Sequence, residues 1–200
     1  MKSQWKNFNP TVAMVEGRLG FLVSWFQDPV RKLGEGGLAA KLAKSNGVKL
    51  YSWEPGRDAE IEHLLKSYDP LHIAVFFCLR PYRGNYTGLS SAEADRVMKK
   101  LIAERTRKPG INGKLKTVEQ VDSLWKADYP GLENWRTYQH PQNGWPDGLF
   151  KQMAEETNML RDNYMCNSII ELVNKGERVF ISMGVSHAPR IEKALKENLE

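Results

Sequence analysis

The chain has 200 residues, no long apolar run and few of the residues that build disulfide or metal frameworks. No stretch approaches the roughly 20 apolar residues that cross a bilayer, so we expect no membrane-spanning helix. Only two cysteines occur, Cys78 and Cys166, each among apolar neighbours in a predicted helix, which favours packing over a disulfide or a catalytic thiol. Trp5 and Asn7 interrupt the apolar core that a signal peptide needs.

Motifs for binding nucleotides or nucleic acids are also missing. The net charge is +5, but lysines and arginines are spread along the chain instead of clustering with aromatic residues, so nucleic acid is not an expected partner. The glycine-rich stretch 34–37 lacks the Lys-Ser/Thr pair of a phosphate-binding loop. Hydrophobic residues make up 41% and charged residues 26%, ordinary values for a globular protein, and we expect one domain over residues 1–200.

Short apolar segments and longer periodic segments alternate along the chain, which predicts an α/β fold. We expect a central, mainly parallel sheet flanked by helices, because the strands are apolar enough to be covered on both faces. The segment 90–146, rich in aromatic residues, proline and glycine, is expected to form a helical and aromatic-loop cap. The predicted strands are 11–15, 48–53 and 179–183, and the predicted helices are 34–45, 58–68, 70–79, 90–105, 117–126, 147–175 and a C-terminal helix from 189. The segment 19–26 is also strongly apolar.

His187 is the strongest candidate for chemistry. It lies between the predicted strand 179–183 and the C-terminal helix, whose first turn contains Pro189. In open α/β sheets, ligands bind in the crevice at the carboxyl ends of the strands. The positive end of the helix dipole disfavours an imidazolium there, and a neutral imidazole can act as a base or a metal ligand. The alternative is that His187 only caps a turn.

Three charged residues are expected to converge on the same edge of the sheet. Glu16 and Glu54 follow the first two predicted strands, and Arg161 falls on the apolar stripe of helix 147–175. An arginine on a buried face needs a partner. Taken singly, these residues could be solvated strand ends and a surface arginine. Together with His187 they can balance charge and still leave a base or a metal site.

Residues elsewhere in the chain are candidates for binding a substrate. Arg80 ends the apolar helix 70–79, while Trp135 and Trp145 lie in the aromatic loop, which could form the wall of a pocket. His140 in the same loop is an outside candidate for a contact of the lid.

Five short motifs follow one another along the chain. They are, in order, Val15-Glu16-Gly17, Trp53-Glu54-Pro55, Leu79-Arg80, Arg161-Asp162-x-x-Met165 and Gly184-x-x-His187. Their order resembles a known superfamily, which contains the TraB/PrgY pheromone-shutdown proteins, the GumN-like proteins, the Tiki metalloproteases and, more distantly, the erythromycin esterases and a haem-binding lipoprotein. The resemblance covers most of the chain outside residues 90–146.

The resemblance implies a hydrolase that acts on an ester or peptide bond of a small-molecule or peptide substrate. It implies that His187 and Glu54 hold a divalent metal ion or activate water, with Glu16 as second ligand or partner of the base. The Arg161-Asp162-x-x-Met165 motif matches the esterase branch most closely and implies a site role for Arg161. In the mechanism that we expect, Arg161 and Arg80 together stabilise developing negative charge. Many members of the superfamily are exported.

The sequence departs from this superfamily at its beginning. Members usually start with another strand that carries a first histidine motif, and no such unit precedes residue 11. We therefore expect the chain to start in the middle of the fold, and to expose a sheet edge through which it forms a homo-oligomer. With one motif histidine left, a metal site would be weak.

Two other functions compete with hydrolysis. One is a non-catalytic binding module for haem or another small ligand, with the aromatic loop as the pocket wall. The other is a regulatory protein that sequesters a peptide. The cofactor is accordingly expected to be a divalent metal ion, or haem in the first alternative.

Overall fold

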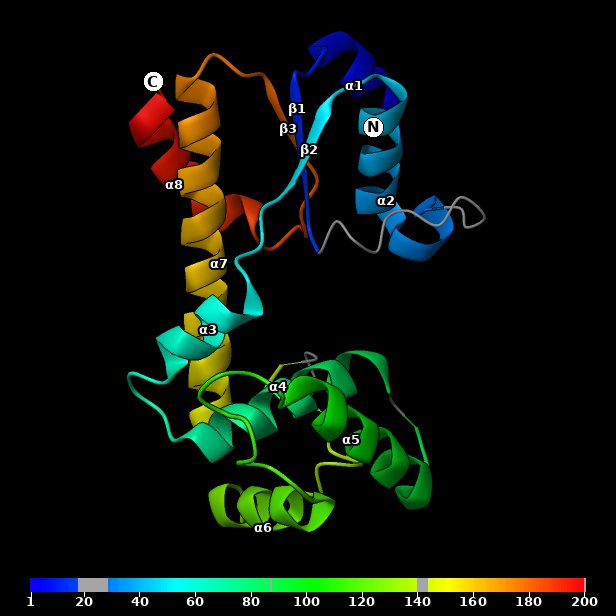
Figure 1. Cartoon of the computed structure of the whole chain (residues 1–200), viewed down its shortest axis with the longest axis vertical. Coiled ribbons are helices and arrows are strands. Elements are labelled where there is room, and N and C mark those ends of the chain that lie inside the picture. The colour runs from blue at the N-terminus through cyan, green and yellow to red at the C-terminus, as the bar shows by residue number, and fades with distance from the viewer. Residues whose placement is uncertain (18–28, 87, 140–143, 200) are drawn as a thin grey trace. The chain divides into compact units, whose positions relative to one another are not determined.

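The computed structural model describes residues 1–17, 29–86, 88–139 and 144–199 (Figure 1). The chain divides into two compact units, one made of Met1–Pro55 with Met159–Glu200 and the other of Gly56–Asn158. Each unit has hydrophobic clusters of its own, whereas the sequence suggested one domain. The apolar segment 19–26 and His140 lie outside the described residues.

The first unit is built on a three-stranded parallel sheet with the strand order β2-β1-β3. The central strand β1 (Val12–Val15) pairs in parallel with β2 (Lys49–Ser52) and with β3 (Val179–Ile181). All four residues of β1 are buried, as expected of a strand with neighbours on both sides and helices on both faces. The predicted α/β fold with a parallel sheet flanked by helices is confirmed.

Helices cover both faces of this sheet (Figure 1). On one face, Ala13 of β1 packs with Trp5 of α1 (Lys2–Phe8) and Ala43 of α2 (Pro29–Ser45). On the other face, the alternate residues of β1 pack against α7 (Leu149–Asn174) and α8 (Ala188–Leu199). The period of two along β1 therefore divides its side chains between two apolar layers.

Helix α2 begins earlier than the sequence predicted and bends at Gly34. The backbone of Gly34 has φ 57° and ψ −134°, values that only glycine adopts readily, and helical conformation resumes after it. The predicted helix start at residue 34 thus corresponds to a kink inside a helix that starts at Pro29.

The open edges of the sheet lie at β2 and β3 within the ranges that the structure describes. An edge beside residues 11–15 is not found, because β1 is hydrogen-bonded to a strand on each side. Along β2 exposed and half-buried residues alternate, and Tyr51 is 42% exposed. Assembly of copies through one of these edges stays a prediction.

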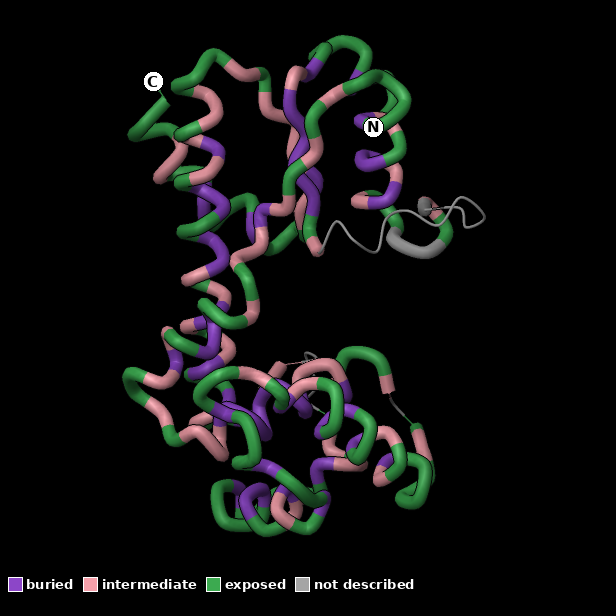
Figure 2. Tube along the Cα trace, in the orientation of Figure 1, coloured by how far each residue is buried: buried purple, intermediate pink, exposed green. Residues whose placement is uncertain are grey.

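The second unit is helical, with α4 (Pro70–Asn85) at its core. Much of α4 is buried (Figure 2). Its eight buried residues pack with residues of the other helices in one cluster. The unit also contains α3 (Arg57–Leu64), α5 (Ser91–Arg105), α6 (Val118–Asp128) and the first part of α7. The segment 90–146, predicted to be a cap, contributes α5 and α6 to this unit, which extends beyond the segment at both ends. None of the helices in the described ranges is long and apolar enough to cross a membrane.

Helix α4 continues past the end that the sequence predicted at Arg80. Pro81 lies inside the helix and removes one backbone donor. Tyr82 is nonetheless buried, with its ring 5.0 Å from that of Trp135, and its hydroxyl donates to the carbonyl of Arg136 at 3.2 Å. These tertiary contacts favour the helical path over the break that a proline usually causes.

Candidate functional site

Arg161 joins the two glutamates that follow β1 and β2. Its Nη2 donates to Glu16 Oε1 at 2.8 Å and also to Glu54 Oε1. The Arg161 side chain is 7% exposed, whereas those of Glu16 and Glu54 are 47% and 28% exposed. The structure therefore brings these three predicted residues together, with the arginine enclosed and the carboxylates reaching toward solvent.

His187 is paired with Asp162, the residue after Arg161 on α7. His187 Nδ1 is in hydrogen-bond contact with Asp162 Oδ1, and Arg190 Nε donates to Asp162 Oδ2 at 2.5 Å. Both members of the histidine–aspartate pair are nearly closed off, with side chains 7% and 10% exposed. An ionised carboxylate can only accept, so this contact is a hydrogen bond when His187 carries a proton on Nδ1. No hydrogen-bond partner for Nε2 is found among the described residues.

Trp53 connects the two groups of charged residues. Its ring lies beneath the Arg161 guanidinium, with 5.3 Å between the guanidinium carbon and the ring centroid, and meets the His187 ring edge-on at 5.0 Å. The indole is fully buried and donates to the carbonyl of Ser182, just after β3, at 2.9 Å. Arg161 and His187 therefore contact one indole at the carboxyl edge of the sheet, and Glu16 and Glu54 join the same group through Arg161.

Local structure explains this convergence. Consecutive residues of an α-helix point about 100° apart, so Arg161 can face the ends of β1 and β2 while Asp162 faces the start of α8. His187 directly precedes α8: its amide donates to the Gly184 carbonyl at 3.0 Å, and its carbonyl accepts from the Arg190 amide at 3.0 Å. His187 thus caps a turn and also presents its ring to the site.

The charges in the cluster nearly balance. Three carboxylates, those of Glu16, Glu54 and Asp162, face the two guanidinium groups of Arg161 and Arg190, so one negative charge is left over when His187 is neutral. Arg161 Nε is buried and has no hydrogen-bond partner within the described ranges. A buried donor without a partner costs free energy, so a bound ligand or water that accepts from it would be stabilising.

The arrangement does not fit a metal ion. One oxygen of Glu16 and one of Glu54 are engaged by Arg161, which supplies the positive charge that a cation would otherwise bring. Nowhere in the described part of the chain do three histidine, cysteine or acidic side chains gather as metal ligands. The predicted metal ligands His187 and Glu54 thus find no support in the geometry, and no step is derived through a metal.

The three residues predicted to bind substrate belong to the second unit. Arg80 forms an ion pair with Glu60 at 3.6 Å. Trp135 is only 1% exposed, and its indole donates to Asp122, so it is a core residue and not the wall of an open pocket. Trp145 is half-buried and lies against the guanidinium of Arg83, 4.7 Å from the ring centroid.

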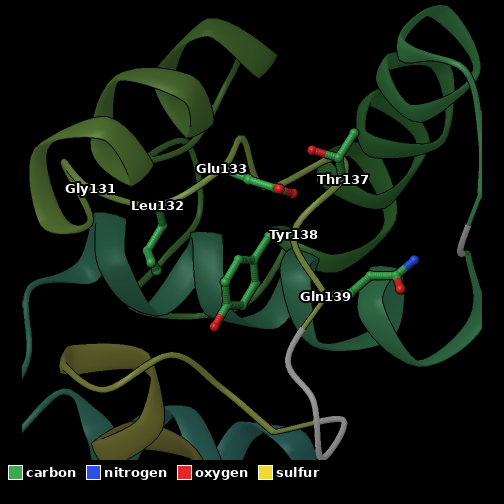
Figure 3. Close-up of a pocket in the computed structure, with 6 residues that line it drawn as sticks. All are labelled: Gly131, Leu132, Glu133, Thr137, Tyr138 and Gln139. Atoms are coloured by element: carbon green, nitrogen blue, oxygen red, sulfur yellow. The ribbon is translucent and has the colours of Figure 1, made fainter.

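A hollow of about 440 Å³ lies in the same loop region of the second unit (Figure 3). Its walls are polar and mostly exposed, and neither Trp135 nor Trp145 belongs to them. The residues that line it are Gly131, Leu132, Glu133, Thr137, Tyr138 and Gln139.

Sequence reasoning missed the roles of Asp162 and Arg190. Asp162 was noticed only as part of the Arg-Asp-x-x-Met motif. No local signal in the sequence marks Asp162, because adjacent residues on a helix point about 100° apart. Arg190 follows His187 by three residues, a spacing that places both on one face of a helix start.

Comparisons with known proteins give no family for the chain. No family model matches it, and neither a curated protein nor a solved structure matches it at a significant level.

Proposed function

We propose that the protein hydrolyses ester or peptide bonds, with His187 as general base. The observation that carries this proposal is the enclosed Asp162–His187 pair, which leaves Nε2 unpartnered at the carboxyl edge of a parallel sheet. A histidine whose Nδ1 proton is held by a carboxylate has its Nε2 lone pair oriented for proton transfer. The Arg161-Asp162-x-x-Met165 motif, which resembles the esterase branch of the superfamily, supports the same reaction class.

In the proposed step, His187 Nε2 removes a proton from water while the water oxygen bonds to the substrate carbonyl carbon. The carbonyl π electrons move to oxygen, and the resulting anion is stabilised by the positive charge of Arg161. The proton on Nε2 then passes to the leaving oxygen or nitrogen as its bond to carbon breaks. Glu16 and Glu54 hold the Arg161 guanidinium in place.

The test is hydrolysis of a panel of generic esters by the wild-type chain and by His187→Gln. We expect the substitution to lower kcat by roughly 10²-fold to 10⁴-fold, the contribution typical of a general base. His63→Gln is the matched control, because His63 pairs with Glu156 in the second unit and is expected to leave the rate unchanged. Equal rates in wild type and His187→Gln, or no hydrolysis of any ester or peptide by the wild type, would contradict the proposal.

A non-catalytic binding module is the second candidate, and the hollow around Tyr138 is the observation that favours it. A small ligand such as haem would then bind in the second unit. Titration with haemin, followed by its absorption spectrum, should show saturation that Tyr138→Ala weakens. Unchanged binding in Tyr138→Ala, or none in wild type, counts against this candidate.

A further inference from the structure

Arg190 contacts both members of the histidine–aspartate pair at once. Its Nε donates to Asp162 Oδ2 at 2.5 Å, and its Nη2 lies 3.1 Å from His187 Nδ1. Asp162 Oδ1 contacts the same Nδ1. The guanidinium, the carboxylate and the imidazole edge therefore form one closed set of contacts, of which Asp162 and His187 are enclosed and Arg190 is 43% exposed.

The contacts at Nδ1 cannot both be hydrogen bonds. An arginine can only donate and an ionised aspartate can only accept, whereas Nδ1 is either protonated or not. If Nδ1 is protonated, it donates to Asp162; if it is not, it accepts from Arg190, and the carboxylate faces a lone pair. The hydrogen bond from Arg190 Nε to Asp162 Oδ2 favours the first state, with Nδ1 protonated. It fixes the carboxylate with Oδ1 toward the ring, where this oxygen can accept from Nδ1–H.

We infer that Arg190 is a positioning residue that holds Asp162 so that His187 keeps its proton on Nδ1 and its lone pair on Nε2. The expected effect of Arg190 on catalysis rests on the proposed function, whereas its effect on the His187 tautomer does not. Arginine suits the role because its guanidinium stays charged and its Nε–H donates to Asp162 Oδ2 in a fixed direction, while Nη2 lies near Nδ1 without bonding to it. A lysine carries one ammonium nitrogen on a flexible stem and holds the carboxylate less firmly.

The structural part is tested by nitrogen NMR of the protein labelled in its histidine rings. The spectrum of wild type should show His187 in the Nδ1–H form alone. Arg190→Gln should show a mixture with the Nε2–H form, and Arg190→Lys should restore the wild-type spectrum only in part. Lys193→Gln on the same helix is the control, because Lys193 is 86% exposed and pairs with Glu197. An unchanged His187 spectrum in Arg190→Gln overturns the inference, whatever the activity.

Asp162→Asn separates positioning from simple ion pairing. It should produce the Nε2–H form more completely than Arg190→Gln, because the acceptor itself loses its charge. If Asp162→Asn leaves the Nδ1–H form intact, the carboxylate does not select the tautomer. The positioning role of Arg190 is then wrong as well, because it acts through this carboxylate. Arg190 is half exposed, so its variants are expected to fold, and an unchanged melting temperature checks this.

Enzyme kinetics test the effect on catalysis independently of the NMR measurement. With any ester that wild type hydrolyses, Arg190→Gln should lower kcat by roughly tenfold or more, as partners that orient functional histidines do, and leave KM nearly unchanged. Asp162→Asn should lower kcat further, toward roughly 10⁴-fold. A rise in KM at constant kcat would make Arg190 a substrate contact and overturn the positioning role. If no ester is hydrolysed, the proposed function fails while the tautomer measurement still decides the inference.

Discussion

Arg161 places a full positive charge in an enclosed part of the first unit, and two carboxylates compensate it unequally. Glu54 is the more buried of the two, with 28% of its side chain exposed against 47% for Glu16. Solvent therefore screens Glu16 more strongly. When Arg161 is removed, the uncompensated charge of Glu54 should therefore lower the free energy of unfolding more than that of Glu16.

A double-mutant cycle on these residues should show unequal coupling. Arg161→Met is expected to lower the free energy of unfolding by about 3 kcal/mol, the low end of the range for breaking a buried pair, because both carboxylates are partly solvated. Adding Glu54→Gln should recover more of this loss than adding Glu16→Gln. Urea unfolding of the single and double variants measures the coupling. Strictly additive losses would show that Arg161 is not coupled to either glutamate. Arg107→Met serves as the control, because it removes an exposed arginine.

The individual residues of the site could be predicted only in part. Glu16, Glu54, Arg161 and His187 stand out in the sequence because each is a charged or titratable residue at the end of an apolar strand or on an apolar stripe. Asp162 does not, because a helical residue next to the stripe usually faces solvent. Its role depends on tertiary packing, which brings the start of α8 against α7.

Strands and helices were easier to predict than their ends. The three strands follow from short apolar runs, and two helix starts follow from capping residues: Ser90 and Thr117 each accept from the third residue of their helix. The end of α4 was missed because Tyr82 packs in the core beyond Pro81. Helix α3 ends at Leu64 instead of 68, and a turn in which Tyr68 donates to Glu156 follows it.

An ion-pair network connects two helices and a loop of the second unit. Arg136 donates through Nε to Asp95 of α5 at 2.6 Å and through Nη1 to Asp122 of α6 at 2.5 Å. Trp135 donates to the same oxygen of Asp122 at 2.6 Å. Burial acts to raise the pKa of Asp122, but the hydrogen bonds from Arg136 and Trp135 outweigh it and hold this pKa below its usual value.

Asp122→Ala should destabilise the second unit in a pH-dependent manner. At about pH 7 we expect a loss of about 1–3 kcal/mol, because two donors lose their acceptor. A carboxyl group whose pKa is lower in the folded state contributes stability above its unfolded pKa of about 3.9, and loses it as the pH falls through the folded value. The difference between wild type and variant should therefore narrow as the pH falls below about 4 in urea unfolding experiments. A constant difference across this range would contradict the assigned role. Asp58→Ala, which removes a surface pair with Lys108, should change stability by less than about 1 kcal/mol.

The two units differ in how the chain builds them. The first unit needs two separate segments, because β3 and α8 come from the C-terminal part of the chain and pack with β1 and β2 from its beginning. The second unit is one continuous segment, Gly56–Asn158, with a core of its own. A continuous segment of roughly 100 residues is long enough to bury a stable core. The sequence did not indicate this division, because 90–146 has no strands and was interpreted as a cap.

The fragment 56–158 should therefore fold on its own. Its core is closed by the first turns of α7, where Phe150 is fully buried against Trp125 and Trp145, with ring centroids 6.3 Å and 5.6 Å away. We expect cooperative urea unfolding and a near-ultraviolet circular dichroism signal from these fixed tryptophans. The shorter fragment 56–148 lacks Phe150 and Met153, both fully buried, and should lose both properties because the aromatic cluster is left open. If 56–158 instead shows no near-ultraviolet signal and unfolds without a transition, its core depends on the rest of the chain and the second unit is not an independent domain.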